Sequence, residues 1–223
     1  MSGEATVYDG EHHPEGPIPA RQQATRILKG TATYSDRFIP DHAQLVGVLE
    51  DLRSRGCVIV FTAGVWDLFH IGHGDYIDKG KIEAAKLYPK AEHLIMVVGV
   101  DTDALTKKRK GPQRPIVPED ERCRVLSLLR PVDIITLQYK LDELFSIVAP
   151  HVQIVSTSTK DLPPGMEVAK SHCEYLVRLP PQAETTTSAR VRRLAFEGKL
   201  ETLQHVSEKL TAAIEEVSRE ING

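Results

Sequence analysis

Two histidines, His70 and His73, stand three positions apart directly after a long apolar run. An imidazole ring can donate a hydrogen bond to a phosphate oxygen, act as a general acid or base, or bind a transition metal. At this spacing both rings share one face of the first turn of a helix. Gly72 lies between them and has no Cβ, so a ligand can approach the backbone closely. The pair therefore indicates a binding or catalytic site at the start of a helix.

The spacing alone leaves three interpretations open. Two histidines on a helix are commonly surface residues, and together with Asp67 they also have a plausible spacing for a zinc site. The chain before and after them favours a third interpretation, phosphate binding. A β-branched apolar run at 58–63 predicts a strand buried on both faces, a turn containing Gly64 follows, and residues 71–88 have helical character. This order places backbone N–H groups and the positive end of a helix against a phosphate.

A second group of candidate residues is basic. The segment Lys107–Pro115 is expected to be a loop, and it concentrates five cations: Lys107, Lys108, Arg109, Lys110 and Arg114. A basic run on its own is commonly a solvated surface or a localisation signal. A flexible loop with such charges can also close over a polyanion once the substrates are bound. Asp101 precedes this loop, at the end of a predicted strand.

A third group carries hydroxyls at a predicted helix start, Thr185, Thr186, Thr187 and Ser188, followed by Arg190. Hydroxyls at such a position commonly serve as helix caps, which contribute about 1 kcal/mol each. They can also bind phosphate together with the N-terminus of the helix.

Strands and helices alternate along the chain, which predicts an α/β fold. Five apolar runs predict strands, at 58–63, 94–100, 132–137, 152–155 and 175–179. Helical patterns lie between them, at 41–55, 71–88, 118–130 and 141–148, with a further helix from Thr185 to Phe196. The alternation predicts a Rossmann-like, doubly wound, parallel five-stranded sheet with helices on both faces. In such sheets ligands bind at the carboxyl ends of the strands, where the histidine turn and Asp101 are expected.

The remaining segments predict the domain organisation and the cellular setting. Residues 1–40 are expected to form a flexible or surface-packed extension, with about the first 24 flexible, and residues 199–223 a long amphipathic C-terminal helix. The net charge of −3 does not suggest a nucleic-acid or membrane binder. The three widely spaced cysteines suit reduced thiols, and no membrane span or signal peptide is recognisable. A cytoplasmic enzyme is therefore expected.

Two segments carry a specific resemblance. The sequence GVWDLFHIGH, at 64–73, resembles the signature of the HIGH-motif nucleotidyltransferases, the cytidylyltransferase-like superfamily, and its surroundings are similar to phosphoethanolamine and phosphocholine cytidylyltransferases. Residues 100–133 resemble the nucleotidyltransferase domain of ADP-heptose synthase and, less closely, archaeal FAD synthases. Residues 185–190 resemble the STTxIR segment of the superfamily, with Ala189 in place of a larger apolar residue. The resemblance covers about residues 57–195, and the nucleotidyltransferase domain is expected at 41–198.

The resemblance implies that a phosphorylated or phosphonate acceptor attacks the α-phosphate of a nucleoside triphosphate and releases pyrophosphate. Mg²⁺ would bridge the phosphates, without metal ligands from the protein. The implied catalytic residues are His70, His73, Lys107 and Arg190. The implied nucleotide-binding residues are Thr62, Ala63, Gly64, Val65, Trp66, Asp67, Gly72, Thr185, Thr186 and Thr187. The implied acceptor-binding residues are Lys110, Arg114 and Asp101.

The nucleotide and the acceptor stay open at this point. CTP is preferred from the DLFHIGH similarity, and ATP is the alternative from the similarity of residues 107–133. The segment 155–161 lacks the glycine that relatives carry there, and Pro180–Ala183 lacks their arginine, which also leaves room for a catalytically weak nucleotide-binding regulator. An aminoacyl-tRNA synthetase fragment is disfavoured by the missing KMSKS-like loop. Because Leu129–Asp133 resembles a dimer-interface segment of glycerol-3-phosphate cytidylyltransferase, a homodimer is expected.

Overall fold

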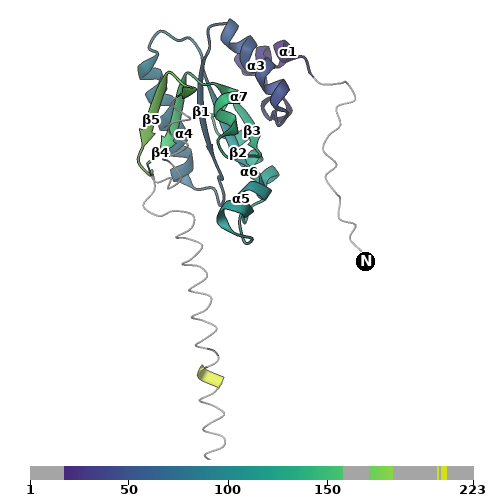
Figure 1. The fold of residues 1–223 in the computed structure, drawn as a ribbon, viewed down its shortest axis with the longest axis vertical. Helices are drawn as coiled ribbons and strands as arrows, with labels where there is room; N and C mark the ends of the chain where they lie inside the picture. The colour runs from purple at the N-terminus through teal and green to yellow at the C-terminus, as the bar shows by residue number, and fades with distance from the viewer. Residues whose placement is uncertain (1–17, 158–170, 183–204, 206, 210–223) are drawn as a thin grey trace, which may run out of the picture. The chain divides into compact units, whose positions relative to one another are not determined.

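A computed structural model describes residues 18–157, 171–182, 205 and 207–209 (Figure 1). The chain divides into two compact units, 1–182 and 183–223. In the second unit, the described residues 205 and 207–209 are helical. The predicted hydroxyl segment 185–190 and most of the predicted C-terminal helix lie outside the described residues.

The first unit contains a five-stranded sheet, which confirms the predicted α/β, Rossmann-like fold. All strand pairs are parallel, and the order is β3-β2-β1-β4-β5. The strands are β1 (Val58–Gly64), β2 (Leu94–Asp101), β3 (Ile134–Gln138), β4 (Val152–Ser156) and β5 (Tyr175–Leu179). The chain runs outward from β1 through β2 to β3 and then returns to β4 on the other side of β1. The switch in strand order therefore lies between β1 and β4, where ligands of such sheets bind.

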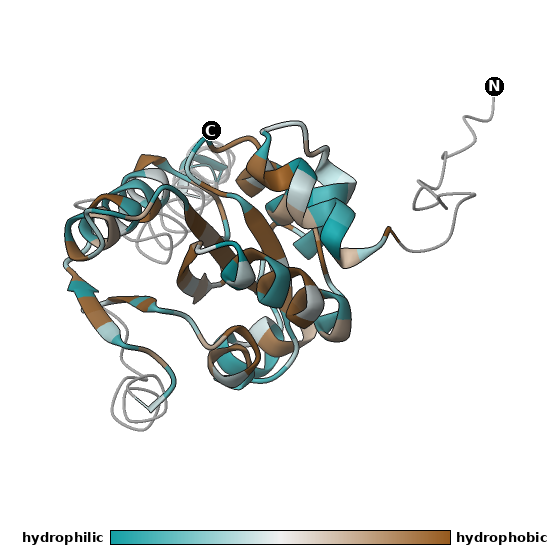
Figure 2. Cartoon of the chain, turned by 90° about the horizontal axis from the view of Figure 1, so that it is seen from above, coloured by the Kyte–Doolittle hydropathy of each residue, from teal (hydrophilic) through white to brown (hydrophobic). Residues whose placement is uncertain are grey.

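Helices cover both faces of this sheet, as the sequence predicts. Side chains of α4 (Ile71–Leu87) and α6 (Glu119–Ser127) share one buried cluster with alternate residues of β1 and β2. Side chains of α1 (Ala20–Leu28), α3 (His42–Ser54) and α7 (Glu143–Val148) share the cluster on the opposite face. Seen from above, the helices turn their hydrophobic sides toward the strands (Figure 2). A strand flanked by two apolar layers must itself be apolar, which explains the continuous run in β1.

The segment before α3 is more ordered than the sequence predicts. Residues 20–24, predicted to be flexible, belong to α1, and the short helix α2 (Tyr34–Arg37) follows. Ala24 is fully buried in the cluster of the α3 face. Phe38 forms an isolated parallel bridge with Ile135, so the chain after α2 covers the free edge of β3. Short amphipathic segments of this kind form because of what they pack against, which a local pattern cannot reveal.

Two further boundaries differ from the prediction. The first part of the predicted basic loop is a helix, α5 (Asp103–Lys110). The Thr102 side chain accepts a hydrogen bond from the N–H of Leu105 and caps this helix, and Gly111, with a φ of +96°, ends it. The helix that begins after Pro118 ends at Ser127 rather than near Arg130.

Neither a disulfide nor a membrane span is found in the described part of the chain. The three cysteines, all of which are described, are free thiols, as the sequence predicts. Among the described residues, no helix combines the length and apolar character needed to cross a membrane.

His151, directly before β4, extends the pairing between β1 and β4 by one residue, with its side chain taking the place of a backbone acceptor. Its backbone N–H donates to the carbonyl of Ile59, and its Nδ1 accepts the N–H of Ile59 at 2.9 Å. Burial holds the pKa of His151 below its ordinary value, with Arg53 acting in the same direction and Glu174 against it. The ring of Tyr88 packs against it edge-on, at 6.0 Å between centroids. The unfolded chain therefore takes up this proton more readily, so the unfolding free energy falls as the pH drops below about 6.5.

This linkage predicts a pH-dependent melting temperature. In His151→Asn, the amide oxygen can replace Nδ1 as the acceptor for Ile59 but does not titrate. Between about pH 7 and pH 5, the melting temperature of the unmodified protein should fall further than that of this variant. His93→Asn serves as the control because His93 is exposed, and it should keep the original pH dependence. Equal slopes in all three proteins would contradict the role of His151.

Candidate active site

The loop that follows β1 is strained and tightly packed. Trp66 and Leu68 have positive φ angles, +57° and +45°, which are uncommon for residues with side chains. The indole of Trp66 is buried, and its Nε1 donates to the carbonyl of Gly99 on β2 at 2.9 Å. A Cβ on Gly64 would lie 3.3 Å from the Trp66 ring, so glycine lets the indole fold back over the strand end. Strained conformations of this kind cluster at functional sites.

Both predicted histidines lie at the start of α4, immediately after this loop. His70 is the N-cap residue, and His73 is in the first turn. Their rings are stacked with 4.0 Å between centroids and 24° between planes. The ring of His73 also contacts Trp66 at 5.6 Å and Phe69 at 5.3 Å. Aromatic neighbours therefore restrict the orientation of His73, which is the preorganisation that a catalytic donor needs.

The hydrogen bonding at the helix start favours one tautomer of the His73 ring. Its Nδ1 accepts the backbone N–H of His70 at 3.4 Å. A neutral imidazole that accepts on one nitrogen carries its proton on the other. In this tautomer Nε2 carries the proton, and an Nε2–H is the kind of donor that can stabilise an oxyanion. The first-turn N–H groups of α4 add the positive end of a 17-residue helix.

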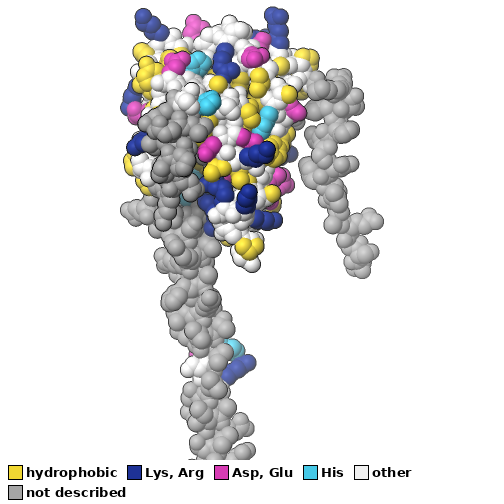
Figure 3. All heavy atoms as spheres, viewed as in Figure 1, with side chains coloured by type: hydrophobic (Ala, Val, Ile, Leu, Met, Phe, Trp, Pro, Cys, Tyr) yellow, Lys and Arg dark blue, Asp and Glu magenta, His cyan; other side chains and the backbone are white. Residues whose placement is uncertain are grey.

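Helix α5 brings the predicted cations to the carboxyl end of β2. Lys107, Lys108 and Lys110 are exposed, and Figure 3 shows Lys and Arg side chains gathered where α5 lies in Figure 1. Arg109 is different, because it forms an ion pair with Asp101. Asp101 is 1% exposed and also accepts a hydrogen bond from Gln138 on β3 at 2.7 Å. Burial raises the pKa of Asp101, and Arg109 opposes this effect. Asp101, predicted to bind the acceptor, thus anchors α5 to the sheet.

Arg114, also predicted to bind the acceptor, is turned toward the loop after β1. Its Nη2 lies 2.8 Å from Oδ2 of Asp67, and its side chain is 12% exposed. Among the described residues, its Nε has no hydrogen-bond partner. Although Lys110 is exposed, neighbouring protein atoms partly desolvate its ammonium group, which lowers its pKa below the ordinary value, and the charges of Arg114 and Arg109 act in the same direction. These three cations therefore lie close enough to repel one another, and an anion would relieve this repulsion.

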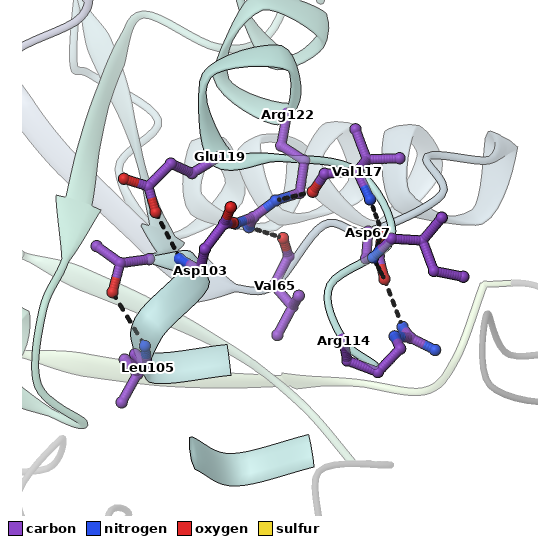
Figure 4. Close-up of polar contacts among 10 residues, drawn as sticks. Val65, Asp67, Asp103, Leu105, Arg114, Val117, Glu119 and Arg122 are labelled. Carbon is purple, nitrogen blue, oxygen red and sulfur yellow. Dashed lines mark hydrogen bonds and ion pairs between the residues drawn. The ribbon is translucent and has the colours of Figure 1, made fainter. Parts of the chain in front are cut away.

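A buried arginine that the sequence analysis missed links these parts (Figure 4). Arg122, on α6, is 2% exposed and donates to the carbonyls of Val65 and Val117 and to Oδ1 of Asp103. Glu119 accepts the N–H of Asp103, at the start of α5. A signal was present in the sequence, because Arg122 lies four positions before the core residue Leu126 on the same helix face.

The structure brings some of the predicted residues together and leaves others unplaced. Ala63, Gly64 and Gly72 lie at the end of β1 and the start of α4, next to the histidines. Several predicted nucleotide-binding side chains are instead buried inside the protein: Thr62, whose hydroxyl lies 3.2 Å from that of Tyr76, Val65, Trp66 and Asp67. Thr185, Thr186, Thr187 and Arg190 lie outside the described residues.

Asp67, the third ligand of the zinc interpretation, is engaged elsewhere. Both carboxylate oxygens of Asp67 accept the N–H of Ile116, and Oδ1 also accepts the N–H of Val117 at 2.9 Å. Among the described residues, no group of three or more histidine, cysteine, aspartate or glutamate side chains could hold a metal ion.

The chain is similar in sequence to curated proteins and in structure to solved proteins. The chain is 34% identical over 164 residues to the bifunctional protein HldE of a Nitratiruptor species, covering 72% of this chain and 32% of that protein. It is 36% identical over 103 residues to the same-named protein of Geobacter metallireducens, covering 46% of this chain and 19% of that one. It thus spans at most about a third of the length of these relatives.

A solved structure, the lipopolysaccharide core biosynthesis protein from Thermoplasma volcanium, shares 25% identity at a TM-score of 0.43. The match covers 56% of this chain and 97% of that one. Residues 61–194 match the family model described as Cytidylyltransferase-like, and this range contains both histidines and the basic helix. The chain therefore belongs to the Cytidylyltransferase-like family of nucleotidyltransferases.

Proposed function

We propose that this protein transfers a nucleoside monophosphate from a nucleoside triphosphate to an anionic small molecule and releases pyrophosphate. The acceptor is a phosphomonoester or a phosphonate. The observation that carries the proposal is the contact between the loop after β1, which leads into the two histidines, and the chain after the basic helix. Asp67 binds Arg114, Ile116 and Val117, so the stacked histidines and the cations share one end of the sheet. The histidines can bind the triphosphate while the cations bind the incoming anion, or the reverse.

The reaction needs no side-chain nucleophile, because an oxygen of the acceptor attacks the α-phosphate and pyrophosphate leaves. The role of the protein is then to position the reactants and to stabilise the charge that develops on the α-phosphate and the leaving group. His73 donates from Nε2, and the N-terminus of α4 adds its partial positive charge. Lys107, Lys110 and, from the segment outside the described residues, Arg190 supply further cations against the repulsion between two anions.

Mg²⁺ is the proposed cofactor, and the triphosphate itself would hold it. Asp67 and Asp101, which follow β1 and end β2, are already paired with Arg114 and Arg109. This arrangement fits Mg²⁺, which commonly keeps several waters and binds mainly to substrate phosphates. When bound, it neutralises phosphate charge and orients the triphosphate.

The nucleotide is proposed to be CTP on the DLFHIGH similarity, with ATP as the alternative on the similarity of residues 107–133. The test is release of pyrophosphate from each of the four triphosphates, with Mg²⁺, across a panel of phosphomonoesters, phosphonates and uncharged alcohols. Efficient turnover with one triphosphate and an anionic acceptor supports the proposal. Turnover with uncharged acceptors alone contradicts it, and binding without turnover favours the regulatory alternative.

Lys107 is expected to act mainly in the transition state. Its contact should strengthen as the two anions meet, so Lys107→Ala should lower kcat more than it raises KM for the triphosphate. Lys108→Ala is the matched control, because Lys108 is the neighbouring exposed lysine on the same helix, and it should change either constant little. Steady-state pyrophosphate release measures both. An effect confined to KM for the triphosphate would assign Lys107 to ground-state binding.

The predicted homodimer stays a proposal. The segment Leu129–Asp133, on which it rests, lies beside Leu128, whose side chain is 83% exposed. Such an apolar residue at the surface suits a contact between subunits. Light scattering should give twice the chain mass, and Leu128→Ser should shift the equilibrium toward monomer. A mass that stays monomeric at every concentration would exclude the dimer.

A further inference from the structure

Two loops near the predicted site are held together by several hydrogen bonds and an ion pair. The first, which we call the histidine loop, is Val65–Asp67, and the second, the connecting loop, is Arg114–Val117 between α5 and α6. Asp67 reaches from the first loop to the second, and the guanidinium of Arg122 contacts both loops (Figure 4). The two loops are about fifty residues apart in the chain, so these contacts are tertiary.

We propose that Asp67 and Arg122 form a positioning clamp, which fixes the histidine pair relative to the cations of α5, and that Asp67 is not a ligand of the nucleotide. This inference rests on the proposed function, because the clamp acts on the site where the transfer takes place. It assigns to Asp67 a different role from the nucleotide contact that the resemblance implies.

The surroundings of the Asp67 carboxylate support this role. Asp67 is 2% exposed. Its two oxygens accept from the backbone N–H groups of Ile116 and Val117 at 2.9–3.1 Å, and Arg114 supplies the positive charge. A buried carboxylate with two backbone donors and a paired guanidinium has its hydrogen-bonding capacity largely used. It also carries the wrong charge to approach a triphosphate, whereas its position directly before the histidines suits an anchor.

Arg122 holds the same two loops from the interior. One guanidinium donates to the Val65 carbonyl, in the histidine loop, and to the Val117 carbonyl, in the connecting loop. Its third partner is Asp103, in the first turn of α5, at 2.6 Å. The planar guanidinium, with its fixed fork of donors, therefore ties three chain segments together at set distances. Because α5 carries the lysines, the clamp couples their position to that of the histidines.

The molecule has a built-in reporter of the clamp. Trp66 is the single tryptophan of the chain and lies between Val65 and Asp67, inside the histidine loop. Its indole is buried, donates to Gly99 and contacts the ring of His73. Loosening of the clamp should therefore expose the indole, and acrylamide quenching of its fluorescence can measure this exposure.

The test compares Asp67→Asn and Arg122→Lys with Asp78→Asn, a control on the exposed face of α4. Circular dichroism first establishes that each variant is folded. If Asp67→Asn does not fold, Asp67→Asn with Arg114→Gln removes the buried unpaired charge and takes its place. Pyrophosphate release then gives kcat and KM for the triphosphate, and acrylamide quenching of Trp66 is measured without nucleotide.

We expect kcat to fall about tenfold or more in each clamp variant, because small misplacements of reacting groups are costly. KM for the triphosphate should change much less, and Trp66 should become more accessible to acrylamide. When Asp67→Asn and Arg122→Lys are combined, kcat should fall by less than the product of the two single effects, because both residues hold Val117. The control should match the unmodified protein in all three measurements.

Two results would overturn the clamp. The first is an Asp67→Asn protein with raised KM and unchanged Trp66 quenching, which would mean that Asp67 contacts the nucleotide. The second is unchanged kcat despite an exposed Trp66. If the unmodified protein turns over none of the triphosphates, the proposed function fails instead. The clamp is then judged by Trp66 quenching alone, where a rise in Asp67→Asn but not in Asp78→Asn supports it and no rise overturns it.

Discussion

Replacing His73 with alanine is expected to lower kcat for pyrophosphate release by about a hundredfold or more, the cost of losing one preorganised donor to a developing oxyanion. His73 accepts on Nδ1 and is packed against the rings of Trp66, Phe69 and His70, so the orientation of its imidazole is restricted before substrate binds. The ring therefore needs little reorientation during the reaction, which is why its loss should be costly. His70→Ala should have an effect of similar size, because its ring stacks on that of His73 at 4.0 Å.

The fold should survive both substitutions, since neither histidine lies in the sheet. Steady-state pyrophosphate release with the preferred triphosphate gives kcat, and circular dichroism verifies folding. His93→Ala, at an exposed position, is the matched control and should retain full activity. Near-normal turnover in either variant of the pair would remove that histidine from the catalytic site. Stoichiometric zinc in the purified protein would instead favour the metal interpretation.

The largest expected effect on stability is that of Arg122→Met. This change keeps most of the side-chain volume but removes the donors to Val65, Val117 and Asp103. Removing one partner of a buried pair costs about 3–5 kcal/mol, and the lower end applies here because the side chain of Asp103 is 30% exposed. For a chain of this size, about 3 kcal/mol lowers the melting temperature by roughly 6–12 °C.

Arg124→Met on the same helix is the control for this measurement. Arg124 is exposed, and its guanidinium lies 4.2 Å from the centroid of the Tyr34 ring, a contact that contributes about 0.5–1 kcal/mol. Thermal unfolding should therefore separate the two variants clearly. Similar small shifts in both would show that the neighbours of Arg122 find other partners.

The contacts of Asp67 and Arg122 also explain how the loop after β1 keeps its strained backbone conformation. Trp66 and Leu68 hold positive φ angles without being glycine, and such conformations persist only when the surroundings enforce them. On one side of Trp66, Arg122 binds Val65, and on the other Asp67 is held by the connecting loop. The clamp residues and the strained residues are therefore direct neighbours in the chain.

The sequence by itself determined the elements whose signals are local. The apolar run at 58–63 predicts β1 because a strand covered on both faces must be apolar throughout, and the helix after the histidines follows from its own pattern. Alternation of strands with helices then predicts the parallel sheet, and a parallel sheet places the histidine turn and Asp101 at the same edge. These inferences need only residue types and their order.

Only the tertiary structure decided which polar side chains are available to a ligand. Asp67, Asp101 and Arg114 have the residue types of a binding site, yet each is paired inside the protein. Arg122 resembles any helical arginine until α6 is packed against the sheet and the two loops meet over it. A carboxylate or guanidinium is drawn into burial by partners about fifty residues away, and that pairing depends on how the chain closes in space. Local sequence specifies the elements, whereas the choice between anchor and ligand is made where the elements meet.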